Sequence, residues 1–193
     1  IGPGLAIPVQ SIAYTNGTAM GSLAPRDVAC YQVTVPSNAP GWKVRLAATA
    51  GDVVLAAGKG RLPNITASQG TSVTNAQTAG KRMLRSGNEH LVILPPAGAT
   101  NILAGPYYLL VASEGMVSSN ATRIGVGNAD YELQSIGPMP EIELGLHDTN
   151  DLVYVGELEG GESTAFHFDN LVDTLGFELS LEDRVGNPVM VSR

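Results

Sequence analysis

The sequence predicts an all-β protein, an antiparallel β-sandwich of jelly-roll type that is present as one complete unit plus a partial second copy. Three observations predict it. Apolar and polar residues alternate with a period of two in several short runs, which is the pattern of half-buried strands. The 193 residues include 23 glycines and 12 prolines, which favours short elements joined by turns. An internal repeat recurs at an offset of 135 residues, whereas few stretches show the helical period.

Turn residues divide the first copy into its expected strands. The strands are residues 7–14, 31–35, 42–48, 53–57, 89–94, 107–112 and 131–136. Asn16-Gly17 is a turn dipeptide after the first strand, and Pro8 within that strand indicates a sheet edge. Residues 36–41 contain two prolines and a glycine, which ends the second strand, and Gly51-Asp52 forms the turn before the fourth. Short strands separated by such turns are typical of a sandwich or jelly roll.

The second copy is identified by matches at one constant offset. The Ile-Gly-Pro of residues 1–3 recurs at 136–138, and the alternating run Trp42–Leu46 matches the run Phe177–Leu181. Apolar positions are kept, whereas the intervening Lys and Arg become Glu and Ser, as expected when only one face of a strand is buried. Both runs are therefore expected to form the same half-buried strand. We predict a complete β-sandwich repeat unit at 1–135 and the N-terminal part of a second, truncated copy at 136–193.

Composition and charge exclude some classes of partner. Charged residues make up 15% of the chain, below the roughly 25% typical of soluble domains, so uncharged polar residues must cover much of the surface, as in many secreted β proteins. The net charge of −7 is uneven: residues 1–135 carry +3 and residues 136–193 carry −10. The acidic second part argues against nucleic acid as a partner.

Hydropathy and cysteine content bear on location. No apolar run approaches the roughly 18 residues needed to cross a bilayer, so no membrane insertion is expected. Residues 1–4 lack the basic start of a signal peptide, and the chain is expected to be a mature or excised segment. Cys30 is the single cysteine, so no intrachain disulfide can form, and its apolar neighbours predict a buried, inert thiol.

Four short motifs follow one another along the first copy. They are Gly51-Asp52-Val53-Val54-Leu55, then Gly60-Arg61-Leu62-Pro63, then Gly105-Pro106-Tyr107-Tyr108-Leu109-Leu110-Val111, and finally Tyr131-Glu132-Leu133. This series resembles the bacterial pre-peptidase C-terminal domain family over residues 21–135 and, in part, 156–190. The resemblance implies a secreted jelly-roll sandwich of the kind that accompanies exported peptidases and other large surface proteins of bacteria. It also implies that some related modules bind collagen, polysaccharide or calcium.

The sequence offers little catalytic chemistry. It has no Gly-x-Ser-x-Gly elbow and no His-Glu-x-x-His zinc motif. Of its three histidines, His90, His147 and His167, the first and the last are expected at outward positions on strands. We therefore expect no enzymatic activity and no cofactor.

Calcium is the one metal that the sequence suggests, because calcium is bound by carboxylate and carbonyl oxygens from loops. Asp27, Asp52 and Asp130 are weak candidate ligands, and the acidic residues between Glu141 and Glu159 form a further cluster. The alternative is structural. Asp27 could cap a turn, Asp52 suits a Gly-Asp turn, and the cluster could be a solvated acidic face.

Ligand-binding candidates are equally few. Tyr107 and Tyr108 are adjacent, so one of them must face away from the core, where a tyrosine can stack on a sugar or peptide or pack against a neighbouring strand. The long loops at 58–88 and 113–130 are the other places where a rigid sandwich would carry a binding function.

Two functional hypotheses remain. The first is a non-catalytic structural or spacer repeat of a large secreted or cell-surface bacterial protein. The second is an accessory module that binds substrate, polysaccharide or protein for an exported peptidase or other hydrolase. The expected partners are other copies of the repeat or neighbouring domains of the same protein. Half a sandwich leaves its apolar face and sheet edges bare, which leaves three outcomes open for the truncated second copy. Its missing part lies outside this chain, it packs on the first copy, or a second molecule completes it by self-association. Both hypotheses place the chain outside the cell.

Overall fold

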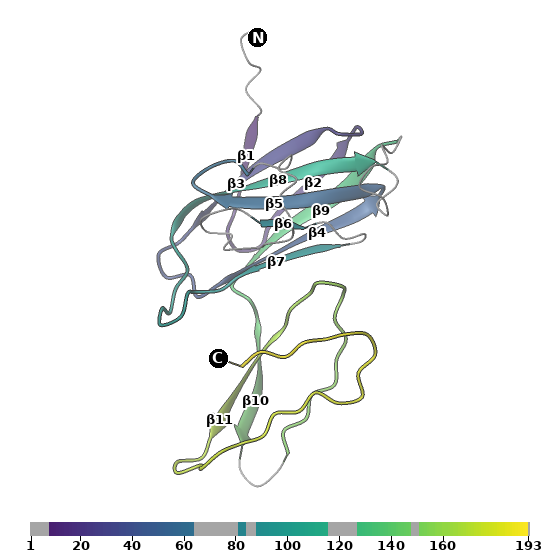
Figure 1. The fold of residues 1–193 in the computed structure, drawn as a ribbon. Coiled ribbons are helices and arrows are strands. Elements are labelled where there is room, and N and C mark those ends of the chain that lie inside the picture. Colours follow the sequence, from purple (N-terminus) through teal and green to yellow (C-terminus); the bar gives the residue numbers. More distant parts are fainter. Residues whose placement is uncertain (1–7, 64–80, 84–87, 116–126, 148–150, 193) are drawn as a thin grey trace. The chain divides into compact units, whose positions relative to one another are not determined.

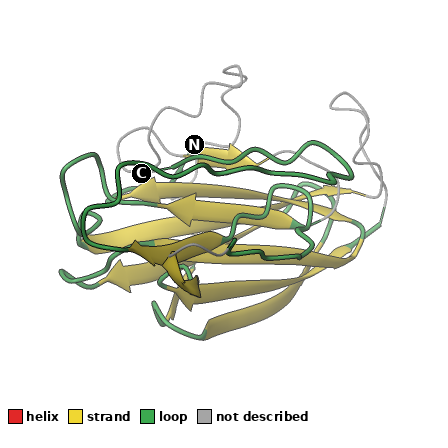
Figure 2. Cartoon of the chain, turned by 90° about the horizontal axis from the view of Figure 1, so that it is seen from below, coloured by secondary structure: helices red, strands yellow, loops and turns green. Residues whose placement is uncertain are grey.

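The structure is a computed structural model, and it describes residues 8–63, 81–83, 88–115, 127–147 and 151–192. The described ranges contain eleven strands and no helix, which confirms the predicted all-β sandwich (Figures 1 and 2). No helix in these ranges is long and apolar enough to cross a membrane. The chain divides into two compact units: unit 1 is Ile1–Glu141 with Gly156–Ala165, and unit 2 is Ile142–Val155 with Phe166–Arg193.

One sheet of unit 1 has five strands in the order β1-β3-β8-β5-β6. Their bounds are β1 Val9–Ile12, β3 Val28–Val35, β8 Gly105–Gly115, β5 Asp52–Lys59 and β6 Lys81–Met83. The neighbouring pairs are antiparallel except β1 and β3, which run parallel. β1 lies at the edge of the sheet, as Pro8 predicted.

The second sheet of unit 1 has four antiparallel strands in the order β2-β9-β4-β7. Their bounds are β2 Gly17–Leu23, β9 Ala129–Gly137, β4 Trp42–Ala50 and β7 Glu89–Ile93. The predicted turn at Asn16 precedes β2, and Asn16 adopts the left-handed φ of 54° that asparagine tolerates. The repeat boundary predicted between 135 and 136 falls inside β9, and the division at that point stays a prediction.

The core lies between the two sheets, which pack face to face (Figure 1). Trp42 is fully buried at its centre, as its alternation predicted, and its ring meets that of Tyr107 edge-on at 5.3 Å. The indole nitrogen donates to Ser135 Oγ at 2.9 Å, and that hydroxyl donates to the carbonyl of Tyr14 at 2.6 Å. The polar atoms that come with the aromatic core are therefore hydrogen-bonded, which buried groups require.

Cys30 lies on the opposite face of β3 from Tyr31, in a small cluster with Ala56, Leu110 and Ala112. The thiol is buried and free, as the sequence predicted, and burial raises its pKa. Cys30 is thus kept in its less reactive protonated form.

Unit 2 contains a two-stranded sheet of β10, Glu141–His147, and β11, Ala165–Asn170. The expectation that Phe177–Leu181 repeats the strand Trp42–Leu46 is wrong, because residues 171–192 contain no strand. The reason is physical. In unit 1 this run is held between β7 and β9, and the described part of unit 2 offers no strand in either role. An alternating pattern needs neighbours before its backbone can pair.

Strand boundaries in unit 1 otherwise follow the predicted ones within a few residues, except that β1 is shorter than the predicted 7–14. Two strands were not predicted. β2 is rich in glycine and other small residues and has a weak alternating pattern, while β6 has three residues inside the predicted long loop. Most of the predicted loops at 58–88 and 113–130 lies outside the described residues.

Candidate functional site

Basic and polar side chains gather on the outer face of β4 and β7. Along β4, Lys43 and Arg45 alternate with the buried Trp42, Val44 and Leu46, so their side chains point away from the core. Arg45 is directly opposite His90 in the antiparallel pairing of β4 with β7. The alternation of two strands therefore brings two cationic side chains and an imidazole onto one surface.

The segment Gly156–Ala165, which belongs to unit 1, brings two carboxylates to this surface. It turns tightly at Gly160-Gly161: the amide of Glu162 donates to the carbonyl of Glu159 at 2.9 Å. The turn closes on itself in a second way, because the amide of Glu159 donates to Glu162 Oε2 at 3.1 Å. Gly161 has a φ of 84°, a conformation that glycine adopts without strain. The turn fixes both carboxylates on one side.

Lys43 binds the carboxylate of Glu162. Its Nζ donates to Glu162 Oε1 at 2.9 Å and to the carbonyl of Ser163 at 3.2 Å. The lysine is only 8% exposed, so most of its side chain is covered. Charge-assisted hydrogen bonds are stronger than neutral ones, and partial burial reduces their screening by salt.

Three donors converge on the carboxylate of Glu159. Asn88 Nδ2 and His90 Nε2 both lie 2.9 Å from Glu159 Oε2, and Arg45 NH2 lies 3.2 Å from Glu159 Oε1. The side chain of His90 is 1% exposed, and its Nδ1 has no hydrogen-bond partner within the described part of the chain. Because a carboxylate only accepts, Nε2 of His90 must carry the proton in this contact.

These six residues, Lys43, Arg45, Asn88, His90, Glu159 and Glu162, are called the carboxylate clasp below. The Asn88 hydrogen bond, followed by those of Arg45 and His90, lowers the pKa of Glu159 to about 2. The hydrogen bond from Lys43 lowers the pKa of Glu162. Both carboxylates are therefore ionised at neutral pH, and their oxygens are used in holding the turn. Such an arrangement can fix a chain segment on a sheet.

Sequence reasoning found parts of the clasp without assembling it. It placed Lys43, Arg45 and His90 on outward faces correctly, yet His90 is covered by a distant segment. The sequence places Glu159 in an acidic cluster, for which the two predictions were a solvated face and a calcium site. The available signal was the opposite net charge of the two parts, +3 for residues 1–135 and −10 for residues 136–193. That signal does not say which acidic residues meet which basic ones.

The calcium candidates are spread over different environments. Asp27 is exposed and its Oδ1 accepts from the amide of Val28 at 2.9 Å, Asp52 is 5% exposed, and Asp130 is exposed. The described residues hold no group of three or more His, Cys, Asp or Glu side chains placed to bind a metal ion. Glu159, which comes from the acidic cluster, has amide, guanidinium and imidazole partners instead.

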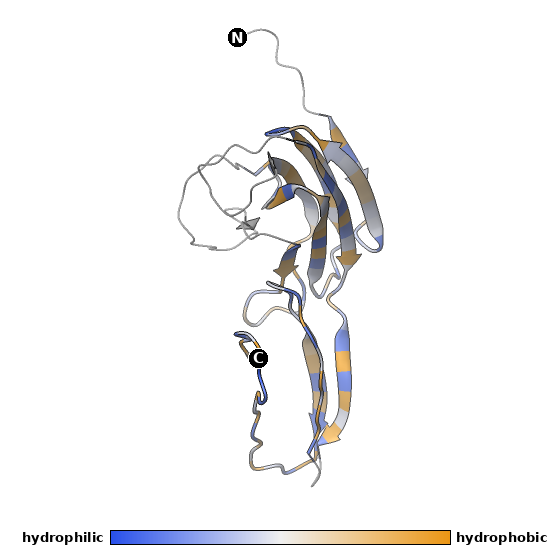
Figure 3. Cartoon of the chain, turned by 90° about the vertical axis from the view of Figure 1, so that its right-hand side faces the viewer, coloured by the Kyte–Doolittle hydropathy of each residue, from blue (hydrophilic) through white to orange (hydrophobic). Residues whose placement is uncertain are grey.

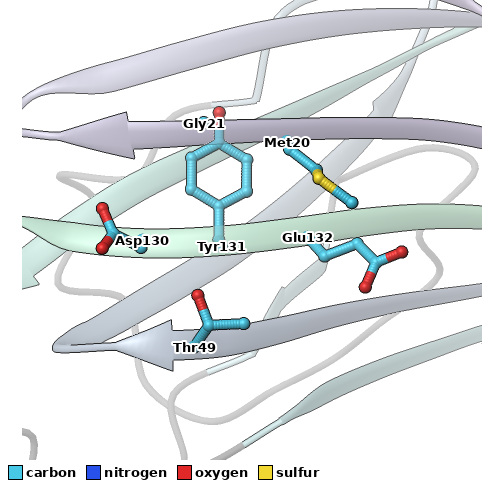
Figure 4. Close-up of a pocket in the computed structure, with 6 residues that line it drawn as sticks. All are labelled: Met20, Gly21, Thr49, Asp130, Tyr131 and Glu132. Carbon is cyan, nitrogen blue, oxygen red and sulfur yellow. The ribbon is translucent and has the colours of Figure 1, made fainter.

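Asp130 borders an open pocket of about 410 Å³ between β2, β4 and β9. Its lining residues are Met20, Gly21, Thr49, Asp130, Tyr131 and Glu132. Figure 4 shows the Tyr131 ring extending from β9 towards Gly21 on β2, where a side chain would leave no room for it. The Tyr131 hydroxyl lies 2.6 Å from that of Tyr31. Burial and this contact raise the pKa of Tyr131.

The tyrosine pair divides between core and surface. Tyr107 is fully buried, its hydroxyl donates to the carbonyl of Leu103 at 2.9 Å, and burial raises its pKa to about 12. Tyr108 is partly exposed on the other face of β8. Tyr107 is therefore a core residue, and Tyr108 is the one available to a ligand or to cross-strand packing.

Comparisons with known proteins were made for sequence and for fold. The sequence matches no protein-family profile and no curated protein sequence. Among solved structures, the pre-peptidase C-terminal domain of collagenase from Bacillus anthracis matches with a TM-score of 0.38 and 16% identity, over 68% of this chain and 98% of that one. PliG from Aeromonas hydrophila, a periplasmic inhibitor of g-type lysozyme, matches with a TM-score of 0.35 and 10% identity, over 66% and 95%.

Proposed function

We propose that this chain is a non-catalytic β-sandwich repeat that acts as a structural or spacer module in a large secreted or cell-surface bacterial protein. The observation that carries the proposal is the carboxylate clasp. It brings Lys43, Arg45 and His90 together on the sandwich and uses them to hold the chain's own segment Gly156–Ala165. A site occupied by the next segment of its own chain suits a connecting role.

The repeat offset supports this role. Moved by 135 residues, β1 becomes 144–147 and β3 becomes 163–170, and these ranges overlap β10 and β11. β10 and β11 form a sheet with each other, as β1 and β3 are neighbours in theirs. This overlap supports the proposed repeat at these two strands, whereas 152–158, the counterpart of β2, is not a strand. In the same alignment, Gly156–Ala165 corresponds to Gly21–Cys30, which covers the end of β2, the turn after it and the start of β3.

The residues of the clasp also distinguish the copies from each other. The counterparts of Lys43 and Arg45 in the second copy are Glu178 and Ser180, so that copy lacks the two cations at these positions. The counterpart of Glu159 in the first copy is Ala24. An acidic turn that is accepted by one copy and not by the other favours a fixed order of modules along a chain.

The proposal is tested by releasing the clasp while leaving the sandwich intact. The variant Glu159→Gln/Glu162→Gln should be cleaved faster than wild type within 156–165 by a protease that cuts at small residues, because the turn loses its ion pairs. Its main thermal transition should change little. Glu157→Gln, which neutralises an acidic residue of the same segment outside the clasp, is the matched control.

The accessory-module alternative predicts a different result. Saturable binding of a polysaccharide or collagen-type peptide to the wild-type chain, abolished by Tyr108→Ala, would assign the sandwich a binding function. Equal cleavage of the clasp variant and its control would remove the observation on which the spacer role rests.

A further inference from the structure

Unit 2 presents an unusually exposed apolar face. Aromatic side chains contact one another there, with ring centroids 4.8 Å apart for Tyr154 and Phe166 and 5.3 Å for Phe168 and Phe177. Phe166 is nevertheless 46% exposed and Phe177 50% exposed, and Leu179 follows at 42%. Figure 3 shows apolar bands alternating with polar ones along β10 and β11. An apolar face of this kind marks an interaction surface.

The repeat shows what covers the same positions in unit 1. Phe166 and Phe168 correspond to Tyr31 and Val33, which are 3% and 0% exposed. Both are on β3, whose neighbour β8 places Leu109 opposite Tyr31 and Tyr107 opposite Val33. Tyr107 also packs against Trp42, the counterpart of Phe177. One strand, β8, therefore lies against the residues that match this face.

β11 has fewer neighbouring strands than β3, its counterpart in the repeat. β3 lies between β1 and β8 in its sheet, whereas β11 pairs with β10 and with no other strand of the described residues. One edge of β11 therefore has no strand of the described residues beside it. Unpaired strand edges accept added strands through main-chain hydrogen bonds, and alternate side chains then enter the neighbouring apolar positions.

We propose that β11 is an acceptor edge for an extended antiparallel strand of the β8 pattern, aromatic-x-Leu-x-Val, whose leucine lies opposite Phe166 and whose aromatic residue lies opposite Phe168. The proposal rests on the repeat used in the proposed function. Charge argues for this occupant over a second copy of unit 2, because residues 136–193 carry −10 and two such units repel. β8 has uncharged side chains from Pro106 to Ser113.

The test uses the full 193-residue chain and a synthetic peptide of residues 105–113 with two lysines added at each end. Binding is measured by fluorescence anisotropy of the labelled peptide, and its place by hydrogen exchange. We expect saturable binding with slowed exchange of amides in β11. A scrambled peptide with the same lysines controls for attraction to the acidic unit, and should bind at least about tenfold more weakly.

Two chain variants provide the second control. Phe168→Ser should weaken binding of the peptide by about tenfold or more. Val172→Ser should leave it unchanged: Val172 is 91% exposed, and its counterpart in unit 1 is Ser37, which faces solvent. Equal binding of the peptide to both variants, or no binding to the wild-type chain, would overturn the proposal.

Sedimentation distinguishes the remaining occupant. Concentration-dependent dimerisation of the chain without peptide, abolished by Phe168→Ser, would assign the face to a second copy and overturn the strand proposal. These outcomes are separate from the proposed function, because the clasp is in unit 1 and its cleavage test does not depend on β11.

Discussion

His90 Nε2 lies 2.9 Å from Glu159 Oε2, so an imidazole buried on β7 is joined to a carboxylate 69 residues further along the chain. Arg45 and Asn88 donate to the same carboxylate. These three converging donors define the position of the Glu159 carboxylate. We therefore expect His90 to position Glu159 on the sandwich.

Replacing His90 tests this contact. His90→Phe keeps a ring on β7 and removes the donor, so Glu159 retains two of its donors and its turn is held less firmly. We expect faster hydrogen exchange in 156–165 and a higher pKa for Glu159 than in wild type. His167→Phe is the control, since His167 is exposed and lies in unit 2. Unchanged exchange in His90→Phe would show that the imidazole has no part in holding the turn.

The clasp should resist moderate acid. The pKa of Glu159 is lowered to about 2, from an ordinary value of about 4.3. A carboxylate with a lowered pKa stabilises the folded contact above its ordinary pKa and loses that effect as the pH falls through the lowered value. Protection of 156–165 should therefore persist at about pH 5 and disappear between about pH 4 and about pH 2.

A carboxyl-carbon NMR titration would follow this directly. In Arg45→Gln the pKa of Glu159 should rise and the turn should be released at higher pH. A titration of Glu159 at the ordinary glutamate value in the wild-type chain would contradict the contacts described.

Trp42 should be the most sensitive core position. Its side chain is 0% exposed, packs against Tyr107 and donates to Ser135. Trp42→Ala should lower the free energy of unfolding by about 3–5 kcal/mol, because it removes a large buried ring and leaves a cavity. Trp42→Phe, which keeps an aromatic ring, should cost less. Denaturant unfolding followed by circular dichroism measures both, and equal costs would mean that the site collapses around the smaller residue.

Gly21 should not tolerate a side chain. A Cβ at this position would lie 2.6 Å from the Tyr131 hydroxyl, which is itself 2.6 Å from the hydroxyl of Tyr31. Gly21→Ala should therefore displace the Tyr131 ring and lower the free energy of unfolding by about 1–3 kcal/mol. Gly160→Ala is the matched control, because a Cβ there meets nothing within 4 Å. Identical thermal melting of both variants would show that Tyr131 can move freely.

The sandwich could be predicted because the alternation of apolar and polar residues that indicates its strands is a local pattern. Trp42, Val44 and Leu46 alternate with polar residues, and alternation alone decides which side chains face a core. β2 was missed because glycine, serine and alanine give little contrast along Gly17–Leu23, and it is a strand because it pairs with β9. Phe177–Leu181 was wrongly expected to be a strand for the converse reason: it has the pattern and lacks neighbours.

The clasp could not be predicted for a related reason. Outward positions at Lys43 and His90 follow from alternation, but the residue that covers them comes from a segment more than a hundred residues beyond Lys43. Local patterns carry no record of such a long-range contact. The acidic turn looked like a solvated face because its partners are on other strands.

The contact between Lys43 and Glu162 tests the account most directly, since it joins the sheet to Gly156–Ala165 through partly buried groups, with side chains 11% and 24% exposed. A double-mutant cycle of Lys43→Met and Glu162→Gln, measured by denaturant unfolding of the full chain, isolates their coupling. We predict a favourable coupling of about 0.5–1 kcal/mol, which falls as salt is added. Additive effects of the two substitutions, with no dependence on salt, would contradict the claim that the clasp holds this segment on the sandwich.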